Sequence, residues 1–401
     1  MKEVAIIYNQ SLKAVQGINY VNNSFVEGQK YFKDKGFELK SIFAPDGVFE
    51  CEGKDRLDLI GANVGTVSYE RERRFRSFLR EVLSSNYLVG ASIKYYFNHI
   101  RNAQKAVNRF LKRSNEYDYI IFQDENSAVE YFKRTQKNER LKCILILHCS
   151  KEIHEQARPQ FPALFANMYW TKYIDNNTDY VFENIDKVVY LSQRAVDCSP
   201  VHLNKKTYIF NGEEDVKKHI FEAVHSPMNF VSVASMAWRK GQEYVLEAMA
   251  MLPKDVLGEI KYHLIGSGPQ KSELEALVSK YNLSDNVVFY GARNDVPELL
   301  KGMDVFILPS QSEGLPMSII EALRQGMYLV ATDTGAIPEM IAKGCGEIIE
   351  RDSAQIAKCM IRLLSKNVVT MEAKKKAREH YLKNFTLKSM VYHYCDIMDT
   401  L

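Results

Sequence analysis

Residues 304–341 constrain the fold more than any other part of this 401-residue chain. Val305–Leu308 is a short apolar run of the kind that forms a strand buried on both faces of a parallel sheet. A helical segment follows over Met317–Arg324, with Pro316 at its start and Gly326 just past its end. A strand that leads directly into a helix predicts a parallel α/β sheet, whose ligands bind at the carboxyl ends of the strands.

Two carboxylates lie in this stretch, Glu313 in the turn and Glu321 within the helical segment. The open amides at a helix start attract anions such as phosphate. Carboxylates are suited instead to accepting hydrogen bonds from hydroxyl groups. Phosphate beside hydroxyl-rich groups predicts a nucleotide sugar, although an isolated pair of glutamates at this spacing is more often a helix cap and an exposed residue.

The sequence EGLPMSIIEA at 313–322, followed by GMYLVATDTGAIPE at 326–339, resembles the donor-site signature of family 4 glycosyltransferases, which are retaining enzymes with the GT-B fold. The resemblance runs in order from about residue 209 to 341 and extends more weakly to both termini. It implies that Glu313 lies beside the transferred sugar and that Glu321 binds the ribose hydroxyls. It also implies that Gly314, Leu315 and Pro316 contact the donor.

A chain of this length exceeds what one hydrophobic core usually serves, so two domains are expected. The resemblance implies an α/β GT-B architecture, with two Rossmann-like, doubly wound parallel-sheet domains facing a cleft. We expect residues 1–207 to bind the acceptor and residues 208–386 to bind the nucleotide sugar. A final helix over 387–401 would cross back to the first domain through its apolar face, namely Leu387, Met390, Val391, Tyr394 and Met398.

Alternating apolar and amphipathic segments along the chain predict βα units and a parallel sheet covered on both sides. Strands are expected at 4–8, 38–44, 117–123, 142–148, 186–192, 230–235, 262–266, 287–291, 305–310, 328–332 and 346–350. Helices are expected at 21–35, 127–137, 242–252, 270–281, 296–301 and 317–324.

Two residues of the first half are candidates for the site. His148 ends a predicted strand, and the resemblance implies that a histidine there points toward the transferred sugar. A lone histidine is more often structural, but the carboxyl end of a strand favours a functional role. Gly17 lies in the polar turn 9–19, where the resemblance implies a loop facing donor and acceptor; a glycine that only relieves a turn is an equally good interpretation.

The segment 234–241, ASMAWRKG, lies between a predicted strand and a predicted helix. The family carries an arginine there and, five residues later, a lysine followed by glycine, and both cations bind the donor diphosphate. Lys240 and Gly241 match this pattern, whereas Ser235 stands where the arginine is usual. Arg239 is the candidate to replace that arginine, and the sequence leaves this open.

Two further loops are candidates for donor contacts. Gly266 opens a Gly-Ser-Gly-Pro segment in which Lys271 occupies the third glycine position of a dinucleotide fingerprint, so that fingerprint fails. We expect a tight turn in which Gly266 lets the backbone approach the ligand. The resemblance implies that Ala292 and Arg293, after the next strand, meet the nucleobase mainly through backbone groups.

Residues 69–113 hold eleven lysines and arginines against three acids, with aromatic and aliphatic residues interleaved. This pattern suits a basic amphipathic surface on anionic lipid, and equally a pair of ordinary solvated helices. No fold signature for nucleic acid accompanies it. Seven cysteines without a C-x-x-C spacing argue against disulfides and zinc, and no signal peptide or run of eighteen apolar residues occurs. We expect a cytoplasmic protein, associated with the inner face of the membrane if the basic stretch binds lipid.

The resemblance implies a glycosyltransferase that moves a hexose-type unit from a nucleoside diphosphate sugar, with a UDP-sugar favoured, to a hydroxyl of a glycan or lipid-linked acceptor. Retention at the anomeric carbon is likewise what the resemblance implies. Bacterial surface polysaccharide biosynthesis is the expected setting. Glu313, His148 and Lys240 are the expected catalytic residues. Lys240 and the helix amides would stabilise the leaving diphosphate, so neither a metal nor another cofactor is expected.

Three alternatives stay open on the sequence. A sugar-nucleotide epimerase of the same architecture would need no acceptor. A glycan phosphorylase would be expected to have a much longer chain and a lysine-bound pyridoxal phosphate. A non-catalytic partner subunit would keep the fold while Ser235 weakens the site.

Overall fold

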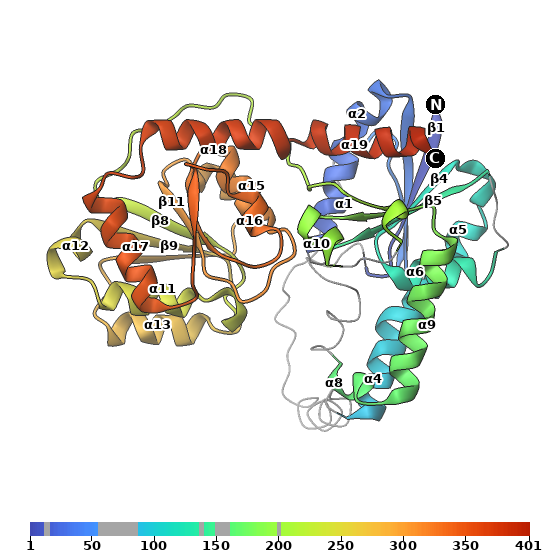
Figure 1. Ribbon diagram of the computed structural model, residues 1–401, viewed down its shortest axis with the longest axis horizontal. Helices are drawn as coiled ribbons and strands as arrows, with labels where there is room; N and C mark the ends of the chain where they lie inside the picture. The colour runs from blue at the N-terminus through green and yellow to red at the C-terminus, as the bar shows by residue number, and fades with distance from the viewer. Residues whose placement is uncertain (12–16, 55–86, 136–139, 149–160, 199–201) are drawn as a thin grey trace. The chain divides into compact units, whose positions relative to one another are not determined.

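The computed structural model describes residues 1–11, 17–54, 87–135, 140–148, 161–198 and 202–401. They form two compact units, the first comprising Met1–Phe210 with Met390–Leu401 and the second comprising Asn211–Ser389 (Figure 1). The chain passes between them within the segment 208–212, three residues beyond the predicted boundary.

A seven-stranded sheet in the order β3-β2-β1-β4-β5-β6-β7 forms the centre of the first unit. Its strands are β1 (Lys2–Ile7), β2 (Phe37–Ala44), β3 (Gly47–Glu50), β4 (Tyr119–Phe122), β5 (Lys142–Leu147), β6 (Lys187–Tyr190) and β7 (Lys206–Tyr208). Only β3 is antiparallel to its neighbour in this sheet. The strand order reverses between β1 and β4, which is where doubly wound sheets bind ligands.

The described helices of the first unit are α1 (Gly17–Glu27), α2 (Gln29–Asp34), α4 (Leu88–Tyr95), the π-helix η1 (Tyr96–Ile100), α5 (Arg101–Leu111), η2 (Ser114–Glu116), α6 (Glu125–Phe132), α8 (Pro162–Phe165), α9 (Met168–Asn184), α10 (Gln193–Asp197), η3 (Leu203–Lys205) and α19 (Leu387–Thr400). Helix α1 begins at Gly17, so the prediction that Gly17 lies inside a turn was wrong. Helix α6 starts two residues before its predicted position, because the Asp124 carboxylate accepts a hydrogen bond from the Ser127 amide at 2.8 Å and caps the helix.

Helices α4, α8 and the first turns of α9 extend away from the first sheet (Figure 1). They share a small apolar cluster of their own, made by Ala91, Tyr95, Ile100, Phe161, Leu164 and Ile174. Tyr95 lies at its centre, with its ring 5.6 Å from Phe161 and 6.0 Å from Trp170. We call this part of the first unit the helical arm.

The second unit contains a parallel six-stranded sheet in the order β10-β9-β8-β11-β12-β13. Its strands are β8 (Met228–Val233), β9 (Ile260–Ile265), β10 (Val287–Gly291), β11 (Val305–Leu308), β12 (Tyr328–Thr332) and β13 (Gly346–Ile349). Its helices are η4 (Trp238–Lys240), α11 (Gln242–Ala250), α12 (Lys254–Gly258), α13 (Lys271–Lys280), α14 (Val296–Leu300), α15 (Met317–Arg324), α16 (Ile337–Met340), α17 (Ser353–Ser365) and α18 (Met371–Asn384). The strand order reverses between β8 and β11, as in the Rossmann fold.

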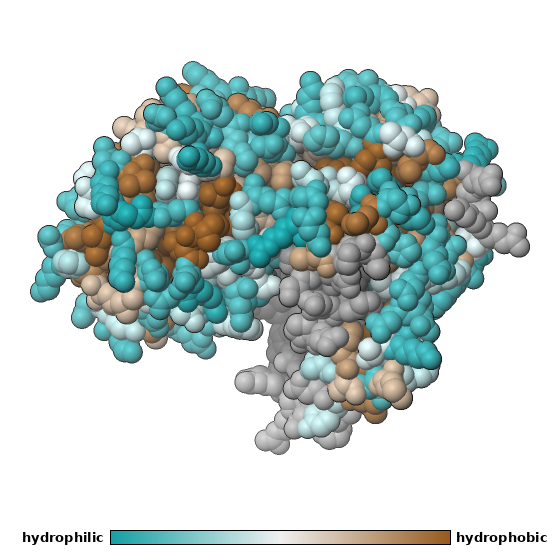
Figure 2. All heavy atoms as spheres, viewed as in Figure 1, coloured by the Kyte–Doolittle hydropathy of each residue, from teal (hydrophilic) through white to brown (hydrophobic). Residues whose placement is uncertain are grey.

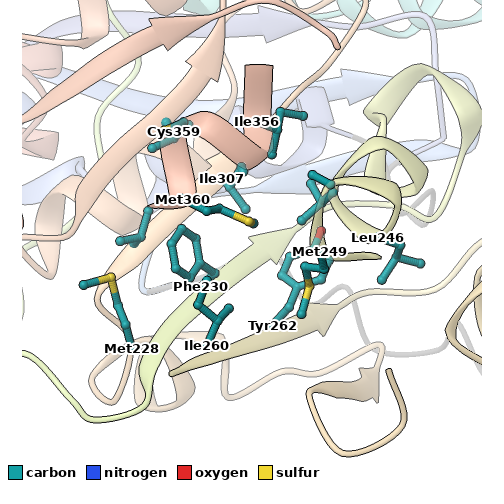
Figure 3. Packing of buried hydrophobic residues seen from close by; sticks show 14 of the residues in the cluster. Met228, Phe230, Leu246, Met249, Ile260, Tyr262, Ile307, Ile356, Cys359 and Met360 are labelled. Atoms are coloured by element: carbon teal, nitrogen blue, oxygen red, sulfur yellow. The ribbon is translucent and has the colours of Figure 1, made fainter. Parts of the chain in front are cut away.

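A large apolar cluster of the second unit lies between the sheet and the helices α11 and α17 (Figure 3). Phe230 and Ile307 contribute from the two central strands, and both are fully buried. Met249 and Met360 fill the space from the helices and are also fully buried. This core explains why β11 reads as a continuous apolar run.

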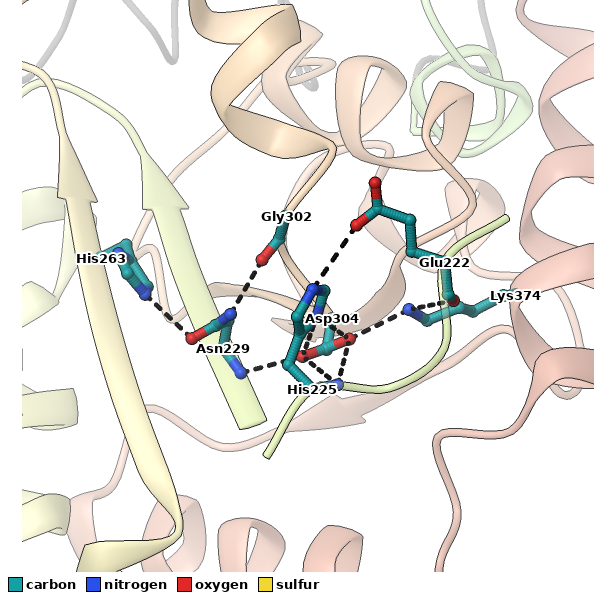
Figure 4. A network of polar contacts seen from close by, with 7 residues as sticks. All are labelled: Glu222, His225, Asn229, His263, Gly302, Asp304 and Lys374. Atoms are coloured by element: carbon teal, nitrogen blue, oxygen red, sulfur yellow. Dashed lines mark hydrogen bonds and ion pairs between the residues drawn. The ribbon is translucent and has the colours of Figure 1, made fainter. Parts of the chain in front are cut away.

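A polar network closes the amino-terminal edge of the same sheet (Figure 4). Asp304 is fully buried just before β11, and its carboxylate accepts hydrogen bonds from Lys374 Nζ at 3.0 Å and from the Asn229 amide at 3.0 Å. The backbone amide and the ring of His225 lie within 3.3 Å of the same carboxylate. These contacts pair a buried lysine with a buried aspartate at the edge opposite the carboxyl ends of the strands.

Helix α19 returns to the first unit. All five residues of its predicted apolar face are buried. The Tyr394 ring lies 5.0 Å from that of Phe25, and the Tyr119 hydroxyl donates to the Met398 carbonyl at 3.0 Å. No helix among the described residues is long and apolar enough to cross a membrane.

Candidate functional site

Two loops meet where the strand order of the second sheet reverses. The loop 234–241 follows β8, and the loop 309–316 follows β11. The Gln311 amide donates to the Arg239 carbonyl at 2.7 Å and ties the loops together. The carboxyl ends of adjacent strands on either side of a reversal form the usual ligand crevice of such sheets, so these loops define the candidate site.

Lys240 and Glu313 form an ion pair between the two loops. Lys240 Nζ lies 2.5 Å from Glu313 Oε1, and the Ser310 hydroxyl donates to the same oxygen at 2.6 Å. The two side chains are only 12% and 7% exposed. Burial lowers the pKa of the Lys240 ammonium, and the negative charge of Glu313 opposes this shift. A phosphate that reaches Lys240 must therefore compete with Glu313 for the same ammonium group.

Glycines allow these loops to approach each other closely. Gly241 has a left-handed φ of +74°, and a Cβ there would lie 2.2 Å from the Pro309 carbonyl oxygen. Gly335 has a φ of +57°, and a Cβ there would lie 2.3 Å from the Glu313 carbonyl oxygen. Both positions exclude any larger residue. The glycine after Lys240 is thus required by packing of the β8 loop against the end of β11.

The loop after β12 holds the backbone of Glu313 and Gly314 through hydrogen bonds. The Glu313 amide donates to the Thr334 hydroxyl at 3.3 Å, and the Ala336 amide donates to the Gly314 carbonyl at 2.8 Å. Sequence reasoning missed Ser310 and Thr334. Their positions, three residues before Glu313 and within the resembling segment 326–339, were the only signal available.

Ser235 and Arg239 are exposed. The Ser235 carbonyl accepts a hydrogen bond from Gln242 Nε2 at 3.0 Å, and Arg239 Nη1 lies 3.5 Å from the Ser312 carbonyl. A residue that the sequence did not single out holds the loops instead. Arg351 Nε donates to the Pro309 carbonyl at 3.2 Å, and its Nη2 donates to the Trp238 carbonyl. Only Lys240, among the candidate cations, reaches Glu313.

Glu321 lies half-buried on α15, whose N-cap is Pro316. Burial raises the pKa of the Glu321 carboxyl to about 7, the charge of Glu213 adds to the shift, and Arg324 opposes it. Gly326 has a φ of +72° just past the helix, as a C-terminal glycine should. Gly314 and Leu315 connect Glu313 to this helix, and Glu321 lies in its second turn, with Glu213 and Arg324 as its charged neighbours.

The remaining candidates of the second unit follow β9 and β10. Gly266 has a φ of +137°, and a Cβ there would lie 2.0 Å from the Ala234 carbonyl oxygen. The backbone at Gly266 therefore packs closely against the loop that follows β8. Ala292 and Arg293 are exposed, and the Arg293 guanidinium binds Asp295 through two hydrogen bonds of 2.6 and 2.8 Å.

In the first unit, His148 follows β5 directly. Its Nε2 lies 2.5 Å from the Gln123 side-chain oxygen, and burial lowers the pKa of the imidazole to about 4. The ring is therefore neutral near pH 7 and can exchange hydrogen bonds with hydroxyls, but it provides no positive charge. Gly17 is the first residue of α1, after the undescribed residues 12–16.

The basic stretch 69–113 is described only from residue 87 onward. Five of its arginines, at positions 71, 73, 74, 76 and 80, lie outside the described residues. In the described part, one face of α4 and η1 carries exposed apolar side chains, namely Leu88, Val89, Ile93, Tyr96 and Phe97. Figure 2 shows brown, tan and pale side chains at the end of the helical arm. No group of three or more metal-ligating side chains lies together in the described part of the chain.

Residues 214–380 match the family model described as "Glycosyl transferases group 1". The putative colanic acid biosynthesis glycosyltransferase WcaL of Salmonella typhimurium is 27% identical over 191 residues, which are 44% of this chain and 46% of that protein. The N-acetyl-alpha-D-glucosaminyl L-malate synthase of Bacillus anthracis is 28% identical over 216 residues, 53% of this chain and 51% of that protein. The chain thus matches about half the length of these relatives.

Solved structures show the same fold along the whole chain. Anabaena Alr3699/HepE in complex with UDP has a TM-score of 0.67 at 14% identity and covers 100% of both chains. The sucrose-phosphate synthase of Thermosynechococcus elongatus has a TM-score of 0.66 at 16% identity and covers 100% of this chain and 99% of its own. The predicted architecture of two Rossmann-like parallel-sheet domains, shared with GT-B glycosyltransferases, is confirmed.

Proposed function

We propose that this chain is a retaining, metal-independent glycosyltransferase that moves a sugar from a nucleoside diphosphate sugar, with a UDP-sugar favoured, to a hydroxyl of a glycan or lipid-linked acceptor. The buried Lys240 and Glu313 pair at the strand-order reversal carries the proposal. Relatives named for colanic acid biosynthesis and lipopolysaccharide synthesis support a role in bacterial surface polysaccharides, and a structural neighbour solved with UDP supports the donor class.

The geometry divides the chemistry between these two residues. As the bond between the sugar and the diphosphate breaks, negative charge grows on the phosphate oxygens. Lys240 and the open amides at the start of α15 provide a positive environment for that charge without a metal. Glu313 loses its lysine partner to the diphosphate and is left to accept hydrogen bonds from the sugar hydroxyls, together with the Ser310 hydroxyl that already holds it.

A hydrolysis screen over UDP-, GDP- and ADP-sugars, analysed by mass spectrometry with and without a chelator, tests the proposal. We expect one donor to be cleaved slowly without an acceptor, at a rate that the chelator leaves unchanged, and the released sugar to keep its anomeric configuration. Interconversion of two nucleotide sugars would identify an epimerase. Donor binding without turnover across a broad acceptor panel would identify a non-catalytic subunit.

Lys240→Ala should weaken binding of a nucleoside diphosphate by about 1.5–3 kcal/mol, the usual contribution of a hydrogen bond to a charged group, and leave nucleoside binding unchanged. Arg239→Ala tests whether the neighbouring arginine replaces the cation missing at Ser235. We expect little change in Arg239→Ala, because its guanidinium lies at the exposed rim beside Ser312. Titration calorimetry with UDP and with uridine measures both effects, and a selective loss of UDP affinity in Arg239→Ala would contradict the single-cation site.

Glu321 makes nucleotide binding depend on pH. Its carboxyl has a pKa raised to about 7, and ribose hydroxyls that donate to it favour the ionised form. Affinity should therefore rise as pH increases through about 7, and binding below that pH should release a proton. Calorimetry in buffers of different ionisation enthalpy measures the proton release, and Glu321→Gln should abolish it while weakening nucleotide binding by about 1–3 kcal/mol. An equal proton release from Glu321→Gln would assign the effect to another group.

We further propose that the enzyme works in the cytoplasm, bound reversibly to anionic lipid at the inner face of the membrane. Residues 88–111 contain Lys94, Arg101, Lys105 and Arg109 and no acid. Arg101 lies over the exposed Phe97 ring at 5.1 Å, so cationic and apolar groups share one surface. Each cation near such a surface contributes about 1 kcal/mol.

Vesicle co-sedimentation tests this surface. Binding should require anionic lipid, decrease with added salt, and decrease in the triple variant Val89→Ser, Ile93→Ser, Phe97→Ser. The matched control, Ile220→Ser with Met251→Ser, removes exposed apolar side chains from the second unit and should bind as wild type. Absence of binding at low salt to vesicles of every composition would leave an ordinary solvated surface and favour a soluble acceptor.

A further inference from the structure

Three side chains of the first unit form a hydrogen-bonded series that ends at His148. Gln123 follows β4 directly, and its Nε2 donates to Asn22 Oδ1 of α1 at 2.9 Å. Its Oε1 lies 2.5 Å from His148 Nε2. Gln123 is 2% exposed and Asn22 is fully buried. The backbone amide of Gln123 donates to the Ile7 carbonyl at 3.0 Å. The series therefore lies at the carboxyl ends of β1, β4 and β5, where the strand order of the first sheet reverses.

The direction of these hydrogen bonds determines where the imidazole proton lies. A glutamine side chain offers a donor on one side and an acceptor on the other. Because Gln123 gives its donor to Asn22, its oxygen faces the histidine and accepts from it. His148 Nε2 then carries the proton, and Nδ1 keeps its lone pair.

We propose that Gln123 and Asn22 are positioning residues that hold His148 in the Nε2-protonated tautomer, so that Nδ1 accepts a hydrogen bond from a hydroxyl of the transferred sugar. The inference rests on the proposed function, because it assigns His148 to the sugar. Burial alone lowers the pKa of the ring to about 4, which keeps it neutral. The neighbouring Asp124 directs its carboxylate to the amides of Asn9 and Ser127 at 2.9 and 2.8 Å.

The opposite arrangement is chemically distinct. If Asn22 donated to Gln123 and Gln123 donated to His148, the imidazole proton would lie on Nδ1. Asn22 Nδ2 is buried and has no hydrogen-bond partner among the described residues, so the contacts of Asn22 do not by themselves choose between the two arrangements. The protonation of the His148 ring must therefore be observed directly. Nitrogen NMR of the imidazole distinguishes the two neutral tautomers directly, and it needs no activity.

In the first experiment, the ring nitrogens of uniformly labelled protein are recorded between about pH 5 and 8, the range in which an ordinary histidine titrates. His148→Gln identifies the signals of His148. We expect a neutral ring protonated on Nε2 throughout, and a loss of that tautomer preference in Gln123→Met. A proton on Nδ1 in the wild type, or an unchanged spectrum in Gln123→Met, would overturn the proposal.

The second experiment uses donor hydrolysis. Gln123→Met should reduce kcat roughly 10- to 100-fold, the range found when a group that orients a histidine is removed. Because this variant also leaves the buried Asn22 oxygen without its donor, Tm should fall, and kcat is compared at a temperature where the variant is folded. Gln123→Glu should raise the pKa of His148 and make kcat at saturating donor fall toward acidic pH, whereas the wild-type kcat stays flat there. Gln104→Met, which removes an amide bonded to Glu130 in the same unit, is the control and should behave as wild type.

Absence of donor hydrolysis in the wild type, with a neutral ring protonated on Nε2 in the NMR spectrum, would contradict the proposed function and leave the tautomer assignment standing. The His148 and Gln123 variants test the inference itself. Full activity in His148→Ala would remove the role of His148 at the sugar, whatever the NMR spectrum shows, and with it this proposal. Loss of activity in His148→Ala, combined with normal kinetics and a normal pH profile in both Gln123 variants, would overturn the positioning role alone.

Discussion

Glu313→Ala is expected to reduce sugar transfer and donor hydrolysis about 10²- to 10³-fold, the loss found when one preorganised polar contact to a reacting group is removed. Affinity for the nucleoside diphosphate should stay the same or increase. Lys240 Nζ lies 2.5 Å from Glu313 Oε1, so removing the carboxylate frees the ammonium for phosphate. Steady-state kinetics measures the first effect, and calorimetry with UDP measures the second.

Glu313→Gln removes the negative charge of the side chain and keeps its shape. The amide keeps an oxygen for the Ser310 hydroxyl but no longer neutralises Lys240, so we expect the same kinetic loss and the same UDP affinity as in Glu313→Ala. Glu298→Ala, which removes an exposed partner of Lys301 on α14, is the control and should leave both quantities unchanged. A large loss of UDP affinity in the two Glu313 variants would assign this residue to nucleotide binding instead.

The second large effect is expected on stability. Lys374→Met should lower the free energy of unfolding by about 3–5 kcal/mol, because it leaves the fully buried Asp304 carboxylate without its cation. The remaining partners of Asp304 are the backbone amides of His225 and Asn229, which carry no full charge, and the His225 ring at 3.1 Å. Chemical denaturation measures the change, and UDP affinity of the folded variant should be unaffected, because this network closes the opposite edge of the sheet.

Lys376→Met on the same helix is the matched control. Lys376 pairs with Glu372 at 2.7 Å, but the two side chains are 46% and 76% exposed. Solvent weakens such pairs, so we expect no measurable change in the free energy of unfolding. Equal stability of the Lys374 and Lys376 variants would show that the Asp304 network contributes no more than a surface ion pair.

The ion pair between Lys240 and Glu313 bears on the absence of a cation at Ser235, where the resembling family usually has an arginine. Arg351 holds the two loops together by donating to the carbonyls of Pro309 and Trp238. The loop that lacks the usual arginine is thus stabilised through contacts to its backbone. In the proposed function, Lys240 is the one candidate cation for the diphosphate, and the Arg239→Ala titration tests this.

The sequence alone predicted most of the strands and the architecture, because buried parallel strands are short apolar runs and the helices between them are amphipathic. Val305–Leu308 and residues 328–332 were located to within two residues for this reason. Helix starts were less accurate. The start of α6 depends on capping by Asp124, and α1 begins at Gly17 within a segment whose polar residues resembled a turn.

Glu313 and Glu321 were candidates from the sequence because they follow a buried strand, and Lys240 was a candidate because of the resemblance. Which of these residues contact one another could not be predicted from the sequence. The pairing of Lys240 with Glu313 spans 73 positions and depends on the adjacency of β8 and β11 and on glycines at 241 and 335 that let the loops meet. The raised pKa of Glu321 and the hydrogen bonds from Gln123 to His148 depend equally on burial and on neighbours distant in the chain. Local sequence determines the elements and their order, whereas charge pairing, protonation and tautomer are decided only when packing brings separate strands together and excludes water.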